Sequence, residues 1–171
     1  MALNRENEKL VNTVYAGLFA ALTALLTAVL HIPVGNGYVH CGDAVIYLAA
    51  AMLPLPYAAG AAAVGGALAD VLSGYAVYAL PTFIIKAMLA AVFSAVGGTQ
   101  MLEKRRILAM ILCGLVSVTG YWLTAVILYG GWAAQFVETV PGNCMQAIAS
   151  GIVYAVIAAA MARNPRGKMK G

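Results

Sequence analysis

The stretch NGYVHCGDAVIYLAAAMLPLP, residues 36–56, decides how the chain folds. In it, an apolar run over about residues 43–53 follows a polar segment and ends at Pro54 and Pro56. A helix rises about 1.5 Å per residue and the hydrocarbon core of a bilayer is about 30 Å thick, so this run is too short to cross a membrane alone. It is either half of one kinked span or a short span of its own.

The composition indicates an integral membrane protein. Of the 171 residues, 63% are hydrophobic and only 9% are charged, and the mean hydropathy is +0.89. A soluble domain of this composition would have too few polar residues to cover its surface. We therefore expect residues 1–171 to form a single membrane domain that has no room for a soluble catalytic domain.

Apolar runs recur along the whole chain. The expected spans lie at about residues 10–30, 43–53, 56–73, 80–97, 106–129 and 140–162. Basic residues accumulate on the cytoplasmic side of membrane proteins, so their distribution distinguishes five spans from six. With six spans, every Lys and Arg except Lys86 is cytoplasmic: Arg5, Lys9, Lys104, Arg105, Arg106, Arg163, Arg166, Lys168 and Lys170.

Five spans would instead place the two later basic clusters outside. The sequence therefore predicts an all-α membrane protein, a six-transmembrane-helix bundle whose N and C termini are both cytoplasmic. The net charge of +4 is also better explained by basic residues placed on the cytoplasmic side of the membrane than by binding to nucleic acid, because these residues cluster at the chain ends and in one loop. Six spans further require the segment VGNGYVHCGD, residues 34–43, to fold back into the bundle, where protein or a wet cavity can satisfy its backbone.

Polar side chains from separate spans should reach one outer level of this bundle. Ionisable groups inside a membrane are costly and usually face a cavity or one another. We therefore expect a water-accessible pocket that opens to the outside and is roofed by residues 34–42. The candidate substrate-binding residues are His40, Asp43, Tyr47, Asp70, Tyr78, Lys86, Tyr121, Trp122, Glu138, Asn143 and Gln146.

Structural alternatives stand beside these assignments. Asp70 and Lys86 could neutralise one another as a structural pair, and Asp43 could act as a helix N-cap. His40 fits a loop or cap residue better than a metal ligand, because no second ligand stands at suitable spacing, and we predict no metal site. Several aromatic residues stand where an interfacial belt would place them.

Small residues repeat every four positions on the first helix, at Ala16, Ala20, Ala24 and Ala28. Such a stripe lets another helix approach closely. The partner helix is either a neighbour within this chain or a helix of another protein.

The ordered set of motifs resembles the substrate-binding S components of energy-coupling factor (ECF) vitamin transporters. The similarity runs over essentially the whole chain and is carried by HCGD at residues 40–43, PGN at 141–143, GGALAD in the third span and PTFIIK in the fourth. Such a resemblance implies a subunit of a prokaryotic plasma-membrane importer that binds a vitamin or precursor from outside. It also implies docking through Ala16, Ala20 and Ala24 onto a T subunit that works with two cytoplasmic ATPases.

Other functions are less well supported by the sequence. No GxxxxGK[ST] motif is present, so ATP hydrolysis would be the work of a partner, and no GxSxG or HExxH motif suggests an enzyme. We expect no cofactor. A stand-alone proton- or ion-coupled transporter, with Asp70, Lys86 and Glu138 as coupling groups, is the main alternative. Acidic and aromatic residues favour a flat heterocycle with amine or hydroxyl donors, such as pyridoxine, hydroxymethylpyrimidine, thiamine, riboflavin or a queuine-type base.

Overall fold

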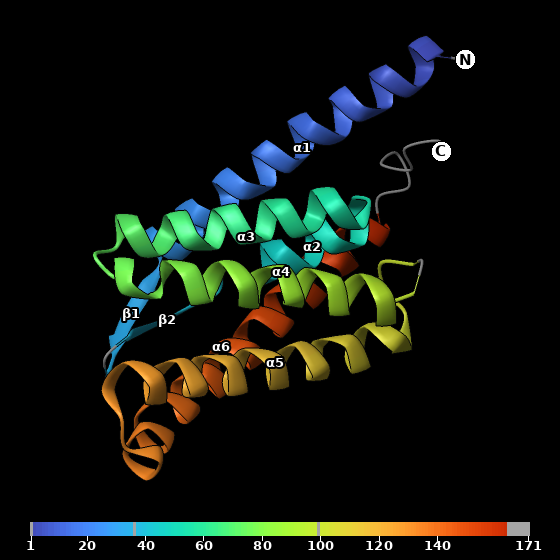
Figure 1. Cartoon of the computed structure of the whole chain (residues 1–171). Helices are drawn as coiled ribbons and strands as arrows, with labels where there is room; N and C mark the ends of the chain where they lie inside the picture. Colours follow the sequence, from blue (N-terminus) through green and yellow to red (C-terminus); the bar gives the residue numbers. More distant parts are fainter. Residues whose placement is uncertain (1, 36, 99, 164–171) are drawn as a thin grey trace.

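The computed structural model describes residues 2–35, 37–98 and 100–163, and these are mainly helical (Figure 1). The helices are α1 (Ala2–Val29), α2 (Asp43–Met52), α3 (Leu55–Leu72), α4 (Ala79–Val96), α5 (Lys104–Tyr129) and α6 (Trp132–Arg163), with a 3₁₀ turn, η1 (Ala76–Tyr78), before α4. An antiparallel hairpin of β1 (His31–Val34) and β2 (Gly37–His40) joins α1 to α2. The hairpin adds a small β element to the all-α architecture that we expected.

Helices long and apolar enough to span a membrane dominate the described residues. Five stretches qualify: Arg5–Val29, Leu55–Leu72, Ala76–Val96, Lys104–Tyr129 and Trp132–Arg163. Helix α2 has 10 residues and is therefore only about 15 Å long. The prediction of a helical, multi-pass membrane protein is confirmed at this level, whereas the sixth span and the cytoplasmic position of both termini stay predictions.

The two prolines separate α2 from α3. A residue that precedes proline is driven out of the helical region, and Leu53 is extended, with φ −111° and ψ 153°. Pro56 lies in the first turn of α3, where its missing N–H costs no hydrogen bond. Residues 43–72 therefore form two helices joined by a tight turn, which agrees with the interpretation used to count six spans.

Helix α2 lies at the centre of the bundle, and the hairpin lies at one end of it (Figure 1). Residues Asp43 to Ala50 are all buried, and α2 packs against α1, α3, α4 and α6. The hairpin pairs His31 with His40 and Val34 with Gly37, and its turn uses Gly35 at φ +56°. The backbone at Gly42 approaches Thr27 of α1 so closely that a Cβ there would overlap the threonine hydroxyl. The loop thus folds back into the bundle, as the six-span interpretation requires.

The alanine stripe of α1 packs inside the molecule. Ala24 is 4% exposed, and Ala16 and Ala20 pack against the core. Gly65 of α3 lies so close to α1 that a Cβ on it would stand 2.6 Å from the Ala20 carbonyl oxygen. Part of the face they form therefore packs on α3 in this conformation, and its role in docking a T subunit stays a prediction.

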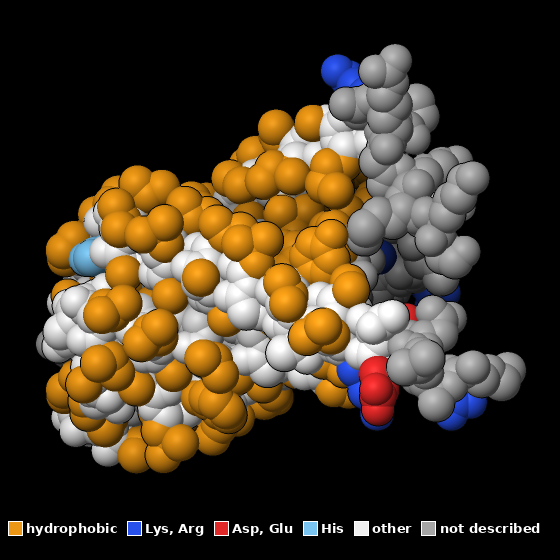
Figure 2. Space-filling view, turned by 90° about the horizontal axis from the view of Figure 1, so that it is seen from above, with side chains coloured by type: hydrophobic (Ala, Val, Ile, Leu, Met, Phe, Trp, Pro, Cys, Tyr) orange, Lys and Arg blue, Asp and Glu red, His pale blue; other side chains and the backbone are white. Residues whose placement is uncertain are grey.

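Charged side chains gather at one end of the molecule, and hydrophobic side chains cover its flank (Figure 2). The N-terminal end of α1, the α4–α5 connection and the end of α6 lie on this same side (Figure 1). Lys9, Lys104 and Arg105 are exposed, whereas Arg106 is buried, donates to the carbonyl oxygens of Gly98 and Gln100 and stacks on Phe93. Arg166, Lys168 and Lys170 lie outside the described residues. The shared end agrees with a common side for the basic clusters.

Candidate functional site

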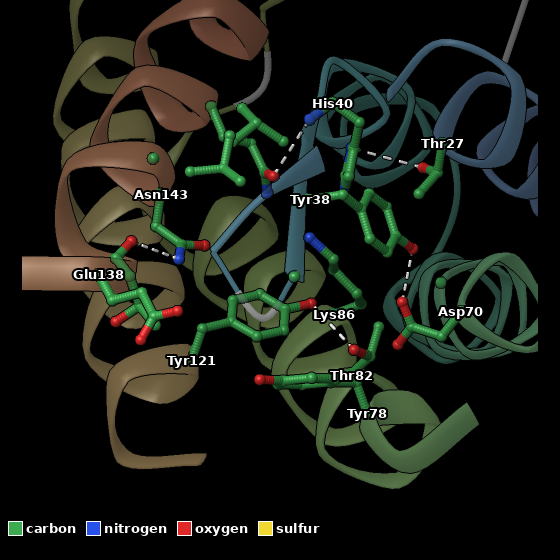
Figure 3. Close-up of a pocket in the computed structure, with 17 residues that line it drawn as sticks. Thr27, Tyr38, His40, Asp70, Tyr78, Thr82, Lys86, Tyr121, Glu138 and Asn143 are labelled. Atoms are coloured by element: carbon green, nitrogen blue, oxygen red, sulfur yellow. Dashed lines mark hydrogen bonds between the residues drawn. The ribbon is translucent and has the colours of Figure 1, made fainter. Parts of the chain in front are cut away.

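A polar pocket lies between the hairpin and the helices at the end opposite the charged one (Figures 1 and 3). Six elements and the hairpin supply its lining: Thr27 from α1, Gly66 and Asp70 from α3, Tyr78 from η1, Thr82 and Lys86 from α4, Tyr121 from α5, Glu138, Thr139, Gly142, Asn143 and Gln146 from α6, and Val34, Gly37, Tyr38, Val39 and His40 from the hairpin. Its volume is about 60 Å³, enough for several waters.

A buried ion pair forms the floor of this pocket. Lys86 Nζ donates to Asp43 Oδ1 at 2.5 Å, and each side chain is 1% exposed. Gln146 Nε2 donates to Asp43 Oδ2 at 3.0 Å, and its Oε1 accepts a bond from the His40 backbone N–H at 3.4 Å. The floor therefore connects α2, α4, α6 and the hairpin, and its charges are compensated as burial requires.

Two structural alternatives from the sequence are wrong. Lys86 pairs with Asp43 rather than with Asp70, because α2 enters the bundle between α4 and α6 and presents its first residue to the lysine. Asp43 is not the N-cap of α2: that position belongs to Gly42, and both carboxylate oxygens of Asp43 are occupied by Lys86 and Gln146.

The wall on the α3 side is built around Asp70, which is 4% exposed. Tyr38 of the hairpin donates its hydroxyl to Asp70 Oδ1 at 2.5 Å (Figure 3). The other oxygen, Oδ2, is buried and has no hydrogen bond of ordinary geometry to any described residue. Nearby, the Tyr121 hydroxyl donates to Thr82 Oγ1 at 3.1 Å, and the Lys86 ammonium lies 5.3 Å from the centre of the Tyr121 ring. Asp70 thus lines the pocket and retains acceptor capacity at its buried Oδ2.

His40 is a structural part of the hairpin base. The Gly42 backbone N–H donates to its Nδ1 at 2.9 Å, so this nitrogen carries a lone pair and the ring is neutral. Burial, with the nearby Lys86 charge as the next cause, lowers the pKa of His40 to about 3. Over the part of the chain described, no group of three His, Cys, Asp or Glu residues is arranged to hold a metal ion.

Helix α6 forms the remaining wall and lies close against the hairpin. A Cβ on Gly142 would stand 3.2 Å from Val39, and a Cβ on Gly35 would stand 2.6 Å from the side chain of Glu138. The helix begins at Trp132 and continues through Pro141, so the expectation that PGN opens the sixth helix near residue 140 is wrong. Asn143 Nδ2 donates to the Thr139 carbonyl oxygen within this turn at 2.9 Å.

Most of the predicted binding residues line this one pocket: His40, Asp70, Tyr78, Lys86, Tyr121, Glu138, Asn143 and Gln146. Asp43 lies directly beneath them. Tyr47 does not line the pocket, because its ring stacks on Phe93 in the core at 4.8 Å between centroids. Trp122 does not line it either, since its indole packs against Trp132 and Phe136. Whether the lining residues bind a substrate stays a prediction.

Sequence reasoning missed Tyr38, Thr27, Thr82 and Thr139. Thr82 precedes Lys86 by four residues, which places both on one helical face, and this spacing could have identified it. Tyr38 stands in the segment expected to roof the pocket, but only the hairpin register turns its hydroxyl toward Asp70.

The fold and the site define a helical membrane protein with a polar pocket under a re-entrant hairpin. Residues 7–163 match the family described as "ECF-type riboflavin transporter, S component", and the chain belongs to this family. It is therefore a multi-pass protein of the cell membrane and a transporter component, and this family is not one of enzymes. Over 124 residues the chain is 36% identical to the "Uncharacterized protein in gap 3'region" of Pyrococcus woesei, a match that covers 71% of this chain and 80% of that protein.

Proposed function

We propose that this chain is the high-affinity substrate-binding subunit of an ECF-type importer. It captures a vitamin or vitamin-precursor heterocycle from outside and delivers it inward together with a T subunit and two cytoplasmic ATPases. The observation that carries this proposal is the pocket itself, in which residues from six elements and the hairpin enclose one cavity at the end opposite the charged one (Figure 1). Family membership supplies the link to transport.

The lining of the pocket suits a flat, polar ligand. Tyr38, Tyr78 and Tyr121 offer aromatic faces, and Asp70, Glu138 and Asn143 offer hydrogen-bonding groups around them. The name of the matching family makes riboflavin one candidate. Pyridoxine, hydroxymethylpyrimidine, thiamine and a queuine-type base remain candidates from the same chemistry.

The hairpin must move for such a ligand to enter. A cavity of about 60 Å³ is far smaller than the roughly 300–1,000 Å³ of pockets that enclose drug-sized ligands. The hairpin is the most movable wall, because it is held to α3 by the Tyr38–Asp70 bond and to α6 by the contact between His40 and Gln146. Ligand entry should therefore open the hairpin, and binding should close it.

A T subunit would have to contact an exposed face of the bundle. On α1, the exposed large residues include Leu18, Leu22 and Leu25, at 53%, 38% and 57% exposure. This leucine face can accept either lipid or a partner helix. We propose it as a second candidate docking surface, beside the face that Ala16, Ala20 and Ala24 form.

Native mass spectrometry of the protein purified from its native membrane in mild detergent tests the binding role. We expect a co-purified small molecule whose mass fits a vitamin-like heterocycle, and a weaker peak for it in Asn143→Leu. Uptake measured in cells at a fixed ion gradient tests the energy source: uptake should stop when ATP is depleted. Uptake that continues without ATP and follows the ion gradient would instead support a secondary transporter.

A further inference from the structure

Asp70 is the one acidic group of the pocket wall whose carboxylate is both buried and incompletely bonded within the described residues. Its side chain is 4% exposed, Tyr38 occupies Oδ1, and Oδ2 has no hydrogen bond of ordinary geometry there. The Thr82 hydroxyl lies beside the Asp70 carboxylate, but each carboxylate oxygen can accept more than one hydrogen bond, so Thr82 leaves room for a ligand donor. A buried carboxylate in this state is costly, so a ligand that donates to Oδ2 gains from removing that cost.

The charges around the pocket do not balance. Lys86 is the cation among the described lining residues, and its ammonium is already paired with Asp43 in the floor of the pocket. His40 is neutral because its Nδ1 accepts the Gly42 N–H. Asp70 and Glu138 therefore face the cavity without a cation of their own among the described lining residues.

We propose that the pocket selects its ligand by charge, with Asp70 as the specificity-determining contact. Oδ2 of Asp70 accepts a hydrogen bond from a protonated amine, an exocyclic amino group or a ring N–H of the heterocycle. The ligand class is thus cationic or rich in N–H donors, and the carboxylated or phosphorylated forms of the same ring are rejected because they would bring an anion against Asp70 and Glu138. This inference rests on the proposed function.

Tyr38 plays a different part at the same carboxylate. It lies on the hairpin, and its hydroxyl occupies Oδ1 of Asp70 and leaves Oδ2 buried without a hydrogen bond among the described residues (Figure 3). Tyr38 is therefore a positioning residue that ties hairpin closure to the wall that contacts the ligand. Removal of its hydroxyl should weaken all ligands alike and leave the charge preference in place.

Isothermal titration of the purified, ligand-stripped protein in detergent at pH 7.5 tests the inference with three series of related ligands. One series is pyridoxamine, pyridoxine and 4-pyridoxic acid, which differ at one substituent and are cationic, neutral and anionic there. The second is thiamine and oxythiamine, which exchange an amino group for a carbonyl oxygen. The third is riboflavin and its 5'-phosphate.

In the series that binds, we expect the amine or neutral form to bind at least about tenfold more tightly than the anionic or oxo form. Asp70→Asn should weaken the donor-bearing ligand about ten- to a hundredfold and bring the two forms within a few-fold of each other. Tyr38→Phe should keep the wild-type preference. The preference of the wild-type protein for the amine or neutral form already tests the charge selection, so the test does not depend on whether a variant folds.

The failures are distinguishable. Equal or tighter binding of the anionic or oxo forms, or an unchanged preference in a folded Asp70→Asn protein, would overturn the charge selection and leave the proposed function standing. Absence of binding in all three series, together with no co-purified small molecule in native mass spectrometry, would count against the proposed function, and the inference would fall with it.

Discussion

Replacing Lys86 by methionine should destabilise the protein strongly, because it leaves Asp43 as a buried charge without its cation. Both side chains are 1% exposed and their charged atoms are 2.5 Å apart. Removal of one partner of a buried pair typically costs about 3–5 kcal/mol. For a chain of this length, 1 kcal/mol corresponds to about 2–4 °C, so the melting temperature should fall by roughly 6–20 °C.

Thermal unfolding in detergent, followed by tryptophan fluorescence or circular dichroism, measures this change. Lys104→Met is the matched control, since Lys104 is exposed at the start of α5 and its loss should change stability by no more than about 0.5 kcal/mol. The double variant Asp43→Asn with Lys86→Met removes both charges and should melt above the single Lys86→Met variant. A single variant that melts like the wild type, or a double variant that melts lower still, would refute the ion-pair floor.

Three further predictions concern the parts that hold the pocket. Gly66→Ala would place a Cβ 2.7 Å from Lys86 Cγ and should lower ligand affinity at least about tenfold in titration calorimetry. The control is Gly60→Ala on the same helix, whose Cβ meets no neighbour within 4 Å among the described residues, so this variant should bind normally. Equal affinities of the two variants would contradict the tight packing of α3 against α4. Burial lowers the pKa of His40 from 6.5 to about 3, so the stability it contributes is complete above pH 6.5 and is lost as the pH falls toward 3. Unfolding at pH 4.5 should therefore be easier than at neutral pH by about 3 kcal/mol, and an equally steep pH dependence in His40→Gln would show that other groups cause it. Ala20→Trp should lower the melting temperature by forcing α1 away from Gly65 on α3, and a fully stable variant that fails only in transport would instead support the docking role of the alanine stripe.

The main lines of the fold could be predicted because they depend on local chemistry. Pro54 and Pro56 end one helix and begin another for steric reasons that hold in any protein. The distribution of basic residues then indicated how many apolar runs cross the membrane and in which direction. With these directions, the few polar residues of the spans could be assigned to a shared depth in the bilayer. Asp70, Lys86 and Asn143 come together on this reasoning alone.

The pairing of side chains within that level could not be predicted. Depth along a helix places Asp43, Asp70 and Lys86 near one another, but only the rotation and packing of α2 decide which carboxylate meets the lysine. The β register that turns Tyr38 to Asp70 is likewise a product of the hairpin turn at Gly35. Pro141 was misleading because a helix in a packed bundle tolerates proline when its neighbours compensate for the lost bond.

A structure of the protein purified with its native ligand, by cryo-electron microscopy or crystallography, tests the account most directly. We expect ligand density beneath the hairpin, in contact with Asp70 on one side and Asn143 on the other, with Lys86 still bonded to Asp43. Ligand density elsewhere in the bundle, or Asp70 and Asn143 turned toward lipid, would contradict it.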